Sequence, residues 1–498
     1  MSWAQALPLL VLASSLLPGL VIFALPERSR GVRTTLNIGG AVVKLGLVIW
    51  MVGQSVQGVH YEFRASLLPG LDMVLRSSAL GLFFVGLSAL LWLVTTVYAI
   101  GYLEDSPHRS RFFGFFSICV IATVGAALAG NLLTFLAFYE LLTLATYPLV
   151  VHRGTDEARH AGRVYLAYTI GGGALVTIGT FWLYSITGTL EFEPGGIVAP
   201  FVAGRARELS IIFVLLVAGV GVKAALVPLH GWLPTAMIAP APVSALLHAV
   251  AVVKVGAFGL IRIVFSTYGI DVATGLGLAQ GLAVIAAISI LYGSMRALVQ
   301  TNLKRLLAYS TVSQLSYITL GIALGVPIAA AGGIVHLVHQ GLMKITLFFA
   351  AGNLAETLGI HEISDMRGVG RRMPWTMAAF TLCAFGMIGT PPLAGFVTKW
   401  YLGVGAIEAG ASWAVWVLVA SSLLNAAYFL PILRMVWFED PSGDWPQERN
   451  FGGAETSLML LLPTLFTAAA ALAVGLFASL PYSPLEWARL IATRQYTP

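Results

Sequence analysis

The sequence predicts an all-α integral membrane protein with about fourteen transmembrane helices, on the evidence of its composition, its apolar runs and the placement of its charges. Of its 498 residues, 58% are hydrophobic and only 10% are charged, and its mean hydropathy is +0.86. Soluble domains carry about 25% charged residues, and no aqueous core hides this much apolar surface. A soluble enzyme is therefore excluded. The net charge of +6 does not indicate nucleic-acid binding, because the basic residues are scattered singly among apolar runs.

The apolar runs set the number of spans. A hydrocarbon core about 30 Å thick takes roughly 20 apolar residues per helix. The first run, residues 3–25, has no basic segment before it and no clear cleavage site after it, so we expect a retained span and not a cleaved signal. The approximate centres of the runs are Ser14, Lys44, Leu90, Val120, Glu140, Val176, Val217, Val252, Ala287, Val312, Gln340, Pro391, Leu423 and Ala470.

The basic residues orient the chain. Loops after odd-numbered helices hold sixteen of the 28 Lys and Arg residues, whereas the other loops and the C-terminal tail hold six. By the positive-inside rule, we expect a prokaryotic-type plasma (inner) membrane protein with both termini on the outer side. The remaining six basic residues fall inside the proposed helices, and these are Lys44, Lys223, Lys254, Arg262, Lys344 and Lys399.

Charges inside a membrane helix cost about 2.5–3.5 kcal/mol each on insertion scales, so they normally face a partner or a water-filled cavity. Glu140 is the acidic residue that lies mid-span. A carboxylate and an amine that exchange partners, such as Glu140 and Lys223, would handle protons, and a static buried ion pair is the alternative. We expect Lys44 about one turn inside a short second span, from where it could snorkel to the interface, as could Arg262 near its helix end.

Four histidines add to the interior polar set, and each stands within about two helical turns of an intramembrane lysine. His248 shares a helix with Lys254, and His339 shares one with Lys344. Imidazole takes a proton on one nitrogen and releases it from the other, so the pattern predicts a proton wire. A bis-histidine haem is the alternative, but the adjacent lysines fit it poorly. The four histidines are His230, His248, His336 and His339.

Prolines interrupt two of the proposed helices. Lys223 precedes one break and Lys399 follows the other, as an inverted repeat requires when its halves cross the membrane in opposite senses. Broken helices at membrane depth indicate a midplane ion site, although ordinary proline kinks are the alternative. The prolines are Pro228, Pro234, Pro240 and Pro242 in the first case, and Pro391 and Pro392 in the second.

No cofactor or metal site is expected. Cys119 and Cys383 lie in long apolar stretches, where they are expected as small buried side chains. Two cysteines cannot supply the usual four thiolates of an iron–sulfur cluster. Sodium wants several oxygen ligands, and one carboxylate among lysines offers few. A quinone- or haem-binding membrane oxidoreductase is the alternative from a different class of function.

Three long segments, which contain most of these residues, resemble the antiporter-like membrane subunits of respiratory complex I, Mrp-type Na⁺/H⁺ antiporters and membrane-bound hydrogenases. They are KAALVPLHGWLPTAMIAPAPVSALLHAVAVVKVGAFGLIR from Lys223, NLKRLLAYSTVSQLSYI from Asn302 and HLVHQGLMKITLFFAAGNL from His336. The resemblance implies two inverted five-helix repeats, helices 4–8 and 9–13, with helices 7 and 12 broken. The expected units are residues 1–110 (helices 1–3), 111–268 (first repeat), 272–437 (second repeat) and 455–480 (helix 14).

The same resemblance implies roles for individual residues. Gln340 stands where many relatives have histidine, so the relay is altered at this turn. Thr235 stands where relatives often have aspartate, which removes an acidic group near the cytoplasmic mouth. Ser310, Thr311 and Ser313 would either support waters along the relay or serve packing alone. By motif, Glu140 resembles the fifth-helix glutamate, Lys223 the seventh-helix lysine, His248 and Lys254 the eighth-helix relay, Lys344 the eleventh-helix lysine and Lys399 the terminal twelfth-helix residue.

The function implied by the resemblance is proton translocation in a multisubunit cation/proton antiporter. The chain ends soon after the fourteenth span, which favours the D-type component of Mrp antiporters. The alternatives are a proton-pumping subunit of a complex I-like or hydrogenase-like redox complex, and a membrane subunit of an inorganic-carbon uptake system. No redox or hydrolytic site is expected in this chain, so any enzymatic role would be as a translocase subunit, NADH-quinone oxidoreductase-like. Expected partners are other membrane subunits, protons and the lipid bilayer, with Na⁺ at a partner or interface and no nucleic acid.

Overall fold

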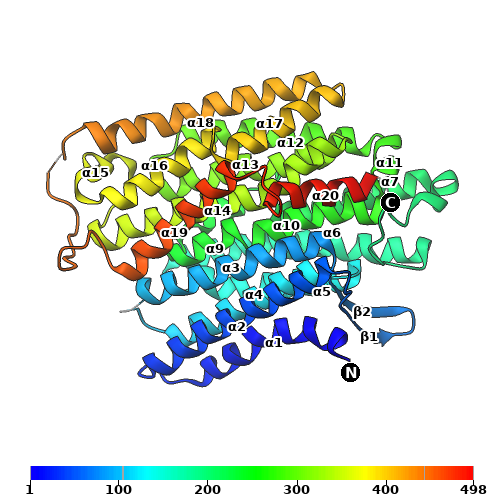
Figure 1. Ribbon diagram of the computed structural model, residues 1–498, viewed down its shortest axis with the longest axis horizontal. Coiled ribbons are helices and arrows are strands. Elements are labelled where there is room, and N and C mark those ends of the chain that lie inside the picture. The colour runs from blue at the N-terminus through cyan, green and yellow to red at the C-terminus, as the bar shows by residue number, and fades with distance from the viewer. Residues whose placement is uncertain (1, 104–105, 442, 497–498) are drawn as a thin grey trace.

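Long helices make up most of the chain in the computed structural model, which describes residues 2–103, 106–441 and 443–496. They run side by side along the longest axis, and their connections gather at its two ends (Figure 1). Within the described residues, twelve helical segments are long and apolar enough to cross a membrane, which confirms the predicted multi-pass, largely helical fold. The twelve are α1 (Trp3–Ala24), α2 (Arg30–Val56), α3 (Ala79–Tyr102), α4 (Arg109–Leu128), α5 (Leu132–Val150), α6 (Asp156–Thr187), the segment Ala241–Tyr268, α12 (Leu278–Leu298), α13 (Leu303–Ala323), α14 (Pro327–Leu358), α18 (Ser412–Phe438) and α19 (Leu458–Leu476).

The first predicted break follows α7 (Val202–Lys223). Its last residue is the lysine itself, and the chain then turns through Ala225, at a φ of +55°, before the single-turn helix α8 (Trp232–Thr235). The end of a helix leaves carbonyl groups without partners. Trp232 satisfies one of them, because its indole Nε1 donates to the oxygen of Val222 at 2.7 Å.

The second predicted break separates α16 (Pro374–Ile388) from α17 (Ala394–Glu408). Gly389 follows α16 with a φ of +94°, a conformation that suits glycine. Both breaks therefore lie where the prolines and lysines indicate. The count of about fourteen crossings, the two inverted repeats and the division at 1–110, 111–268, 272–437 and 455–480 stay predictions.

Short elements connect the long helices. One of them is a β-hairpin between α2 and α3, which an all-α prediction does not include. Within Ala241–Tyr268, the chain forms α9 (Ala241–Ala249), α10 (Val252–Ile261) and the π-helical turn η3 (Arg262–Tyr268). The others are β1 (Glu62–Leu68), β2 (Leu71–Arg76), η1 (Ala199–Phe201), η2 (Ala236–Ile238), α11 (Ile270–Gly275), η4 (Ile363–Met366), α15 (Val369–Arg372) and α20 (Pro484–Tyr496).

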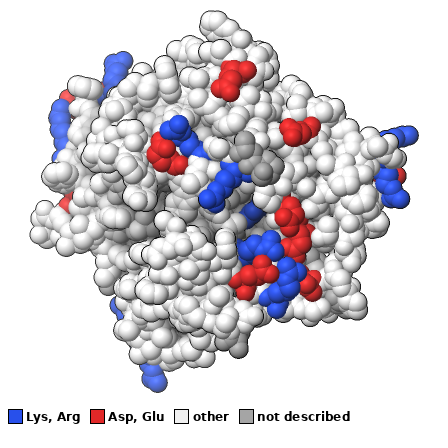
Figure 2. All heavy atoms as spheres, turned by 45° about the vertical axis from the view of Figure 1, so that its right-hand side comes forward, with Lys and Arg blue, Asp and Glu red and all other residues white. Residues whose placement is uncertain are grey.

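Ion pairs hold the hairpin onto the connection between α6 and α7. Arg76 contacts Glu62 at 2.6 Å and Glu191 at 2.9 Å, and Arg64 contacts Glu191 at 3.0 Å. Burial alone would raise the pKa of Glu62, but the hydrogen bond and charge of Arg76, with help from Arg64, hold it below its ordinary value. At this end of the molecule, opposite charges lie against one another on a mostly uncharged surface (Figure 2). The chain begins and ends at this same end (Figure 1).

The centre of the bundle is shielded from lipid. α14 lies in the middle of the ribbon, with α1 and α2 along one edge and α18 along the other (Figure 1). The most apolar stretches of α14 and of Ala241–Tyr268 are entirely buried, whereas those of α1 and α2 are 39% and 33% buried. Polar side chains on the central helices therefore face protein, and most of the predicted site residues are on these helices.

Lys44 corrects one expectation. It is fully buried in the middle of the 27-residue α2, donates a hydrogen bond to Ser15 of α1 and lies 4.6 Å from the centre of the Trp92 ring. The prediction of a short span from which Lys44 could snorkel is wrong, because neighbouring helices cover it on the side that its amine faces. Arg262 does not snorkel either. It is 6% exposed, and its Nη2 donates to Ser78 at the start of α3 at 2.6 Å.

Lys44→Met is expected to leave the fold intact and to raise the midpoint of thermal unfolding by about 1–3 °C. No described carboxylate pairs with Lys44, and methionine fills a similar volume without the cost of burying an amine. Thermal unfolding of the purified protein in detergent measures this. A clear fall in the midpoint would show that the contacts to Ser15 and Trp92 outweigh the burial cost.

Candidate functional site

The predicted site residues, except His230 in the turn between α7 and α8, lie on helices of one packed series. These helices pack on one another in the order α5, α6, α7, α10, α9, α14 and α17. Glu140 on α5 and Lys399 on α17 are partly exposed and stand at the two ends of this order. The site is thus a series of buried amines and imidazoles with a partly exposed charge at each end. The buried members, each at most 8% exposed, are Lys223, His230, His248, Lys254, His336, His339 and Lys344.

Glu140 and Lys223 are close in space but do not form an ion pair. Lys223 donates to the backbone oxygen of Tyr139, the residue before Glu140, and its Nζ lies 3.3 Å from the centre of the Tyr139 ring. The Oε1 atom of Glu140 is buried without a hydrogen-bond partner among the described residues. Gly173 of α6 makes room for this carboxylate, because a Cβ there would overlap it. The static ion pair considered above is therefore not what the structure contains, although the two charges interact.

Lys254 and His248 have hydrogen-bonding atoms that the protein leaves unused. Among the described residues, neither Lys254 Nζ nor His248 Nδ1 has a hydrogen-bond partner. The His248 ring stacks on Phe348 with the ring centres 4.4 Å apart, and its Nε2 lies 3.3 Å from the sulfur of Met237. Buried polar atoms without protein partners are places where ordered water is expected. Such water would extend a proton path between α10 and α9.

His336 and His339 share one partner. Their Nδ1 atoms lie 3.1 and 2.9 Å from the hydroxyl oxygen of Thr398 on α17. A hydroxyl has one hydrogen, so Thr398 can donate to one imidazole only and must accept from the other. When both rings are neutral, they are held in opposite tautomers. Both Nε2 atoms are buried and have no partner in the described part of the chain.

The break between α16 and α17 positions Lys399. Its amine donates to the carbonyl oxygens of Met387 at 3.2 Å and Ile388 at 2.6 Å, which the end of α16 leaves free, and to Ser422 of α18 at 2.8 Å. Asn425, one turn further along α18, donates to the same Met387 oxygen at 2.9 Å. The amine is therefore fixed by neutral oxygens and not by a carboxylate.

Polar contacts also lead from Lys344 to Asn425. Lys344 donates to Ser310 and, at 3.0 Å, to the carbonyl oxygen of Leu307 on α13. The hydroxyl of Tyr428 interacts with Ser310 and donates to the amide oxygen of Asn425 at 2.7 Å. A row of side chains thus connects the lysine of α14 with the group that shares a carbonyl with Lys399.

Some predicted residues do not join this row. His230 packs edge-on against Tyr292, with ring centres 4.9 Å apart, and none of its contacts in the described chain reaches another residue of the predicted relay. The hydroxyl of Thr311 bonds to its own helix. Ser313 reaches the row indirectly, because it lies 2.9 Å from Ser294 on α12, and Ser294 donates to the amide oxygen of Asn425 at 3.5 Å. Gln340 is fully buried, and neither polar atom of its side chain has a hydrogen-bond partner among the described residues. It therefore adds a polar group that does not titrate.

The sequence reasoning missed the polar residues of α17 and α18 that contact the predicted ones. A signal for them exists, because α18 is apolar except for a few polar residues at helical spacing, and one missed residue directly precedes Lys399. Such isolated polar groups inside a span face protein and not lipid. The missed residues are Thr398, Ser421, Ser422, Asn425 and Tyr428.

The donor set of the site suits protons. Within the described residues, no group of three or more His, Cys, Asp and Glu side chains is placed to hold a metal ion. Cys119 and Cys383 are both buried and unpaired. Amines and imidazoles with one carboxylate can accept and release protons, but they give a hard cation few oxygen ligands.

Comparison with known proteins assigns the chain to a protein family. Residues 129–425, more than half of it, match the family described as NADH:quinone oxidoreductase/Mrp antiporter, TM. The chain belongs to this NADH:quinone oxidoreductase/Mrp antiporter family. It is 37% identical over 393 residues to NADH-quinone oxidoreductase subunit N of Desulforudis audaxviator (strain MP104C), covering 77% of each chain. It is 28% identical over 397 residues to the D-type component of the Na⁺/H⁺ antiporter of Bacillus subtilis (strain 168), covering 79% of this chain and 80% of that one.

A solved structure agrees with the family assignment. A chain in the Mrp complex from Dietzia sp. DQ12-45-1b superposes with a TM-score of 0.89 at 23% identity, covering 100% of this chain and 98% of that one. This similarity shows the fold of the NADH:quinone oxidoreductase/Mrp antiporter family. The predicted resemblance is therefore confirmed for family and fold, whereas the roles of individual residues stay predictions.

Proposed function

We propose that this chain is the proton-translocating subunit of a multisubunit cation/proton antiporter of the Mrp type. The observation that carries the proposal is the series of buried amines and imidazoles, several with unpartnered atoms, between the partly exposed Glu140 and Lys399. The relay consists of Glu140, Lys223, Lys254, His248, Lys344 and Lys399, with His230, His336 and His339 in secondary roles.

The contacts of Lys223 suit a group that gains and loses a proton. A carbonyl oxygen and an aromatic ring stabilise its ammonium form without the tight hold of a contacting carboxylate. Glu140 acts from a short distance, because its negative charge favours the protonated amine. Neutralising Glu140, for example by a cation on a neighbouring chain, would therefore favour release of the proton from Lys223.

Protons then pass through the second half of the relay to Lys399. Hydroxyl and imidazole groups can accept on one side and donate on the other, and Thr398 and Tyr428 supply hydroxyls beside the predicted histidines and lysines. Lys399 is partly exposed and lines a cavity of about 300 Å³ between α17 and α18, with Trp400 and Leu423 among its walls. It is the terminal group, from which the proton leaves this chain.

Sodium follows a different path in this proposal. The relay contains one carboxylate among four lysines and would repel a cation. We therefore place any Na⁺ path in a partner protein or at an interface. We place the chain in a prokaryotic-type plasma membrane, with both termini on the outer side and the loops rich in basic residues inside. Its partners are other membrane subunits, as for the relatives that are named subunits of larger complexes.

A second candidate function has the same proton relay but a different source of energy, which is electron transfer. The identity to NADH-quinone oxidoreductase subunit N is 37%, compared with 28% to the Na⁺/H⁺ antiporter component of Bacillus subtilis. This observation favours a proton-pumping subunit of a redox complex whose electron-transfer groups lie in other chains. Identifying the subunits that copurify with the native protein distinguishes the antiporter from the redox complex. The same measurement would also reveal the subunits of an inorganic-carbon uptake system.

The proposal is tested by cation/proton exchange in membrane vesicles that contain the complex with Glu140→Ala or Lys223→Ala. Either substitution is expected to lower exchange about tenfold or more, because each removes a proton-transfer group or its charge partner. Lys44→Met is the matched control, since it removes a buried lysine outside the relay and should leave exchange unchanged. Near-normal exchange in both relay variants, at equal amounts of assembled complex, would contradict the proposal.

A further inference from the structure

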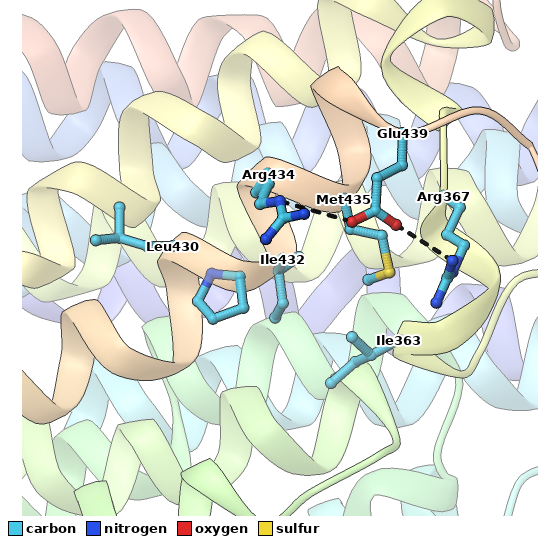
Figure 3. A pocket seen from close by; sticks show the side chains of 8 residues that line it. Ile363, Arg367, Leu430, Ile432, Arg434, Met435 and Glu439 are labelled. Atoms are coloured by element: carbon cyan, nitrogen blue, oxygen red, sulfur yellow. Dashed lines mark ion pairs between the residues drawn. The ribbon is translucent and has the colours of Figure 1, made fainter.

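A groove outside the relay lies where α18 ends. Its volume is about 520 Å³, and it is bounded by the last turns of α18 and by the segment around η4 (Figure 3). Its walls are mostly apolar, formed by Ile363, Leu430, Ile432 and Met435 with a neighbouring proline. None of the contacts that build the proton relay involves these residues.

The groove changes from apolar to charged along the direction of the helix. Leu430, which is 46% exposed, lies one turn before Arg434, about 6 Å along the axis. Arg434 is in the last turns of α18, and Glu439 follows the helix end. A spanning helix ends near the lipid headgroups, so the apolar wall lies at acyl-chain depth and the charges lie at headgroup depth.

At the charged end of the groove, near the end of α18, there are two positive charges and one negative charge. Arg367 and Arg434 share the single carboxylate of Glu439, at 3.3 and 3.8 Å, and Figure 3 shows both guanidinium groups directed at it. Neither guanidinium makes a hydrogen bond within the described chain, although each has five N–H donors. The side chains of Arg367 and Arg434 are 51% and 79% exposed, so their remaining donors face outward.

Other arginines at this end of the molecule are better satisfied. Arg371 bonds to Asp440 at 2.6 Å, and Arg372 bonds to Glu448 at 2.7 Å, each with a carboxylate of its own. The excess positive charge therefore belongs to the groove and is not a general property of the surface.

We propose that this groove binds an anionic phospholipid. The phosphodiester lies between Arg367 and Arg434, where its oxygens accept the unused N–H groups, and an acyl chain lies along Leu430 and Pro431. Net positive charge at headgroup depth selects an anionic lipid over a zwitterionic one. Arg367 lies in a loop and Arg434 in the last turns of α18, and both count among the sixteen basic residues on the side that the positive-inside rule places at the cytoplasm.

Native mass spectrometry of the full-length protein in detergent, titrated with phosphatidylglycerol or phosphatidylcholine, tests the proposal. Wild type is expected to bind phosphatidylglycerol more tightly than phosphatidylcholine, and the double variant Arg367→Gln/Arg434→Gln is expected to lose about tenfold in affinity for phosphatidylglycerol. Glu439→Gln should act in the opposite direction and tighten binding, because it removes the carboxylate that competes with the phosphate. Arg371→Gln, the matched control, should leave binding unchanged.

Four results would overturn the proposal. Equal affinity of wild type for the two lipids would remove the charge selection. Equal binding by the double variant and by Arg371→Gln would show that the arginines of the groove do not contact the headgroup. Competition by inorganic phosphate alone, with no dependence on acyl chains, would indicate a free-anion site. If the double variant instead copurifies with fewer partner proteins while its lipid binding is unchanged, the groove is a protein interface.

Discussion

Valine in place of Thr398 is expected to lower proton transport to about a tenth of the wild-type rate or less. The hydroxyl of Thr398 is the shared partner of His336 and His339, and it holds the two neutral rings in opposite tautomers. A proton that enters one ring at Nε2 can leave it at Nδ1 through the hydroxyl to the other ring. Valine keeps the shape of threonine but breaks this connection. Fluorescence quenching of a pH-sensitive dye in inverted vesicles measures the transport.

Thr398→Ser provides the control for this prediction. Serine keeps the hydroxyl and loses one methyl group, so it should retain most of the transport, even where both variants lose some stability. Loss of the hydroxyl also leaves two buried imidazole nitrogens unpaired, at about 1–3 kcal/mol each. Thermal unfolding of both variants separates this cost from the loss of transport. Normal transport in a folded Thr398→Val protein would show that these two histidines do not pass protons to each other.

The positions of the helix breaks could be predicted from the sequence because their causes are local. Proline lacks the backbone N–H and clashes with the preceding turn, so its effect does not depend on distant residues. Lys223 ends α7 and Lys399 follows the second break, as the prolines around them indicate. The buried charges could be predicted for a similar reason, because the cost of a charge in lipid applies wherever the helix packs.

The partners of these residues could not be predicted, because they depend on how helices rotate against one another. The amine of Lys223 lies over the ring of Tyr139 and not beside the carboxylate of Glu140, and the side chains of these two successive residues point about 100° apart around α5. The same applies to Lys44, whose neighbours on α1 and α3 cover it. The β-hairpin was not predicted for another reason. Its two strands are short and lie between membrane spans, and the long apolar runs of those spans are a much stronger sequence signal than the strands.

Gly256→Ala is expected to destabilise the protein and to disturb the relay at the same time. Gly256 is on α10, and a Cβ there would lie 2.6 Å from the carbonyl carbon of Lys223 and 2.9 Å from Cα of Ala224. Both atoms belong to the backbone, so a change of side-chain rotamer cannot relieve the contact. Overpacking of this kind costs about 1–3 kcal/mol, against about 1 kcal/mol that alanine gains over glycine within a helix.

The functional effect of Gly256→Ala depends on how the protein relieves the contact between the new Cβ and the backbone at the end of α7. α10 must move away from the end of α7, and Lys254, two residues before Gly256, moves with it relative to Lys223. We therefore expect a lower unfolding midpoint and, in the folded fraction, proton transport reduced about tenfold. Gly171→Ala on α6 is the matched control, because nothing lies within 4 Å of a Cβ there. It should leave proton transport unchanged and raise the unfolding midpoint slightly, since alanine favours the helix. If both variants behave alike, proton transfer does not require the close approach of α10 to the end of α7.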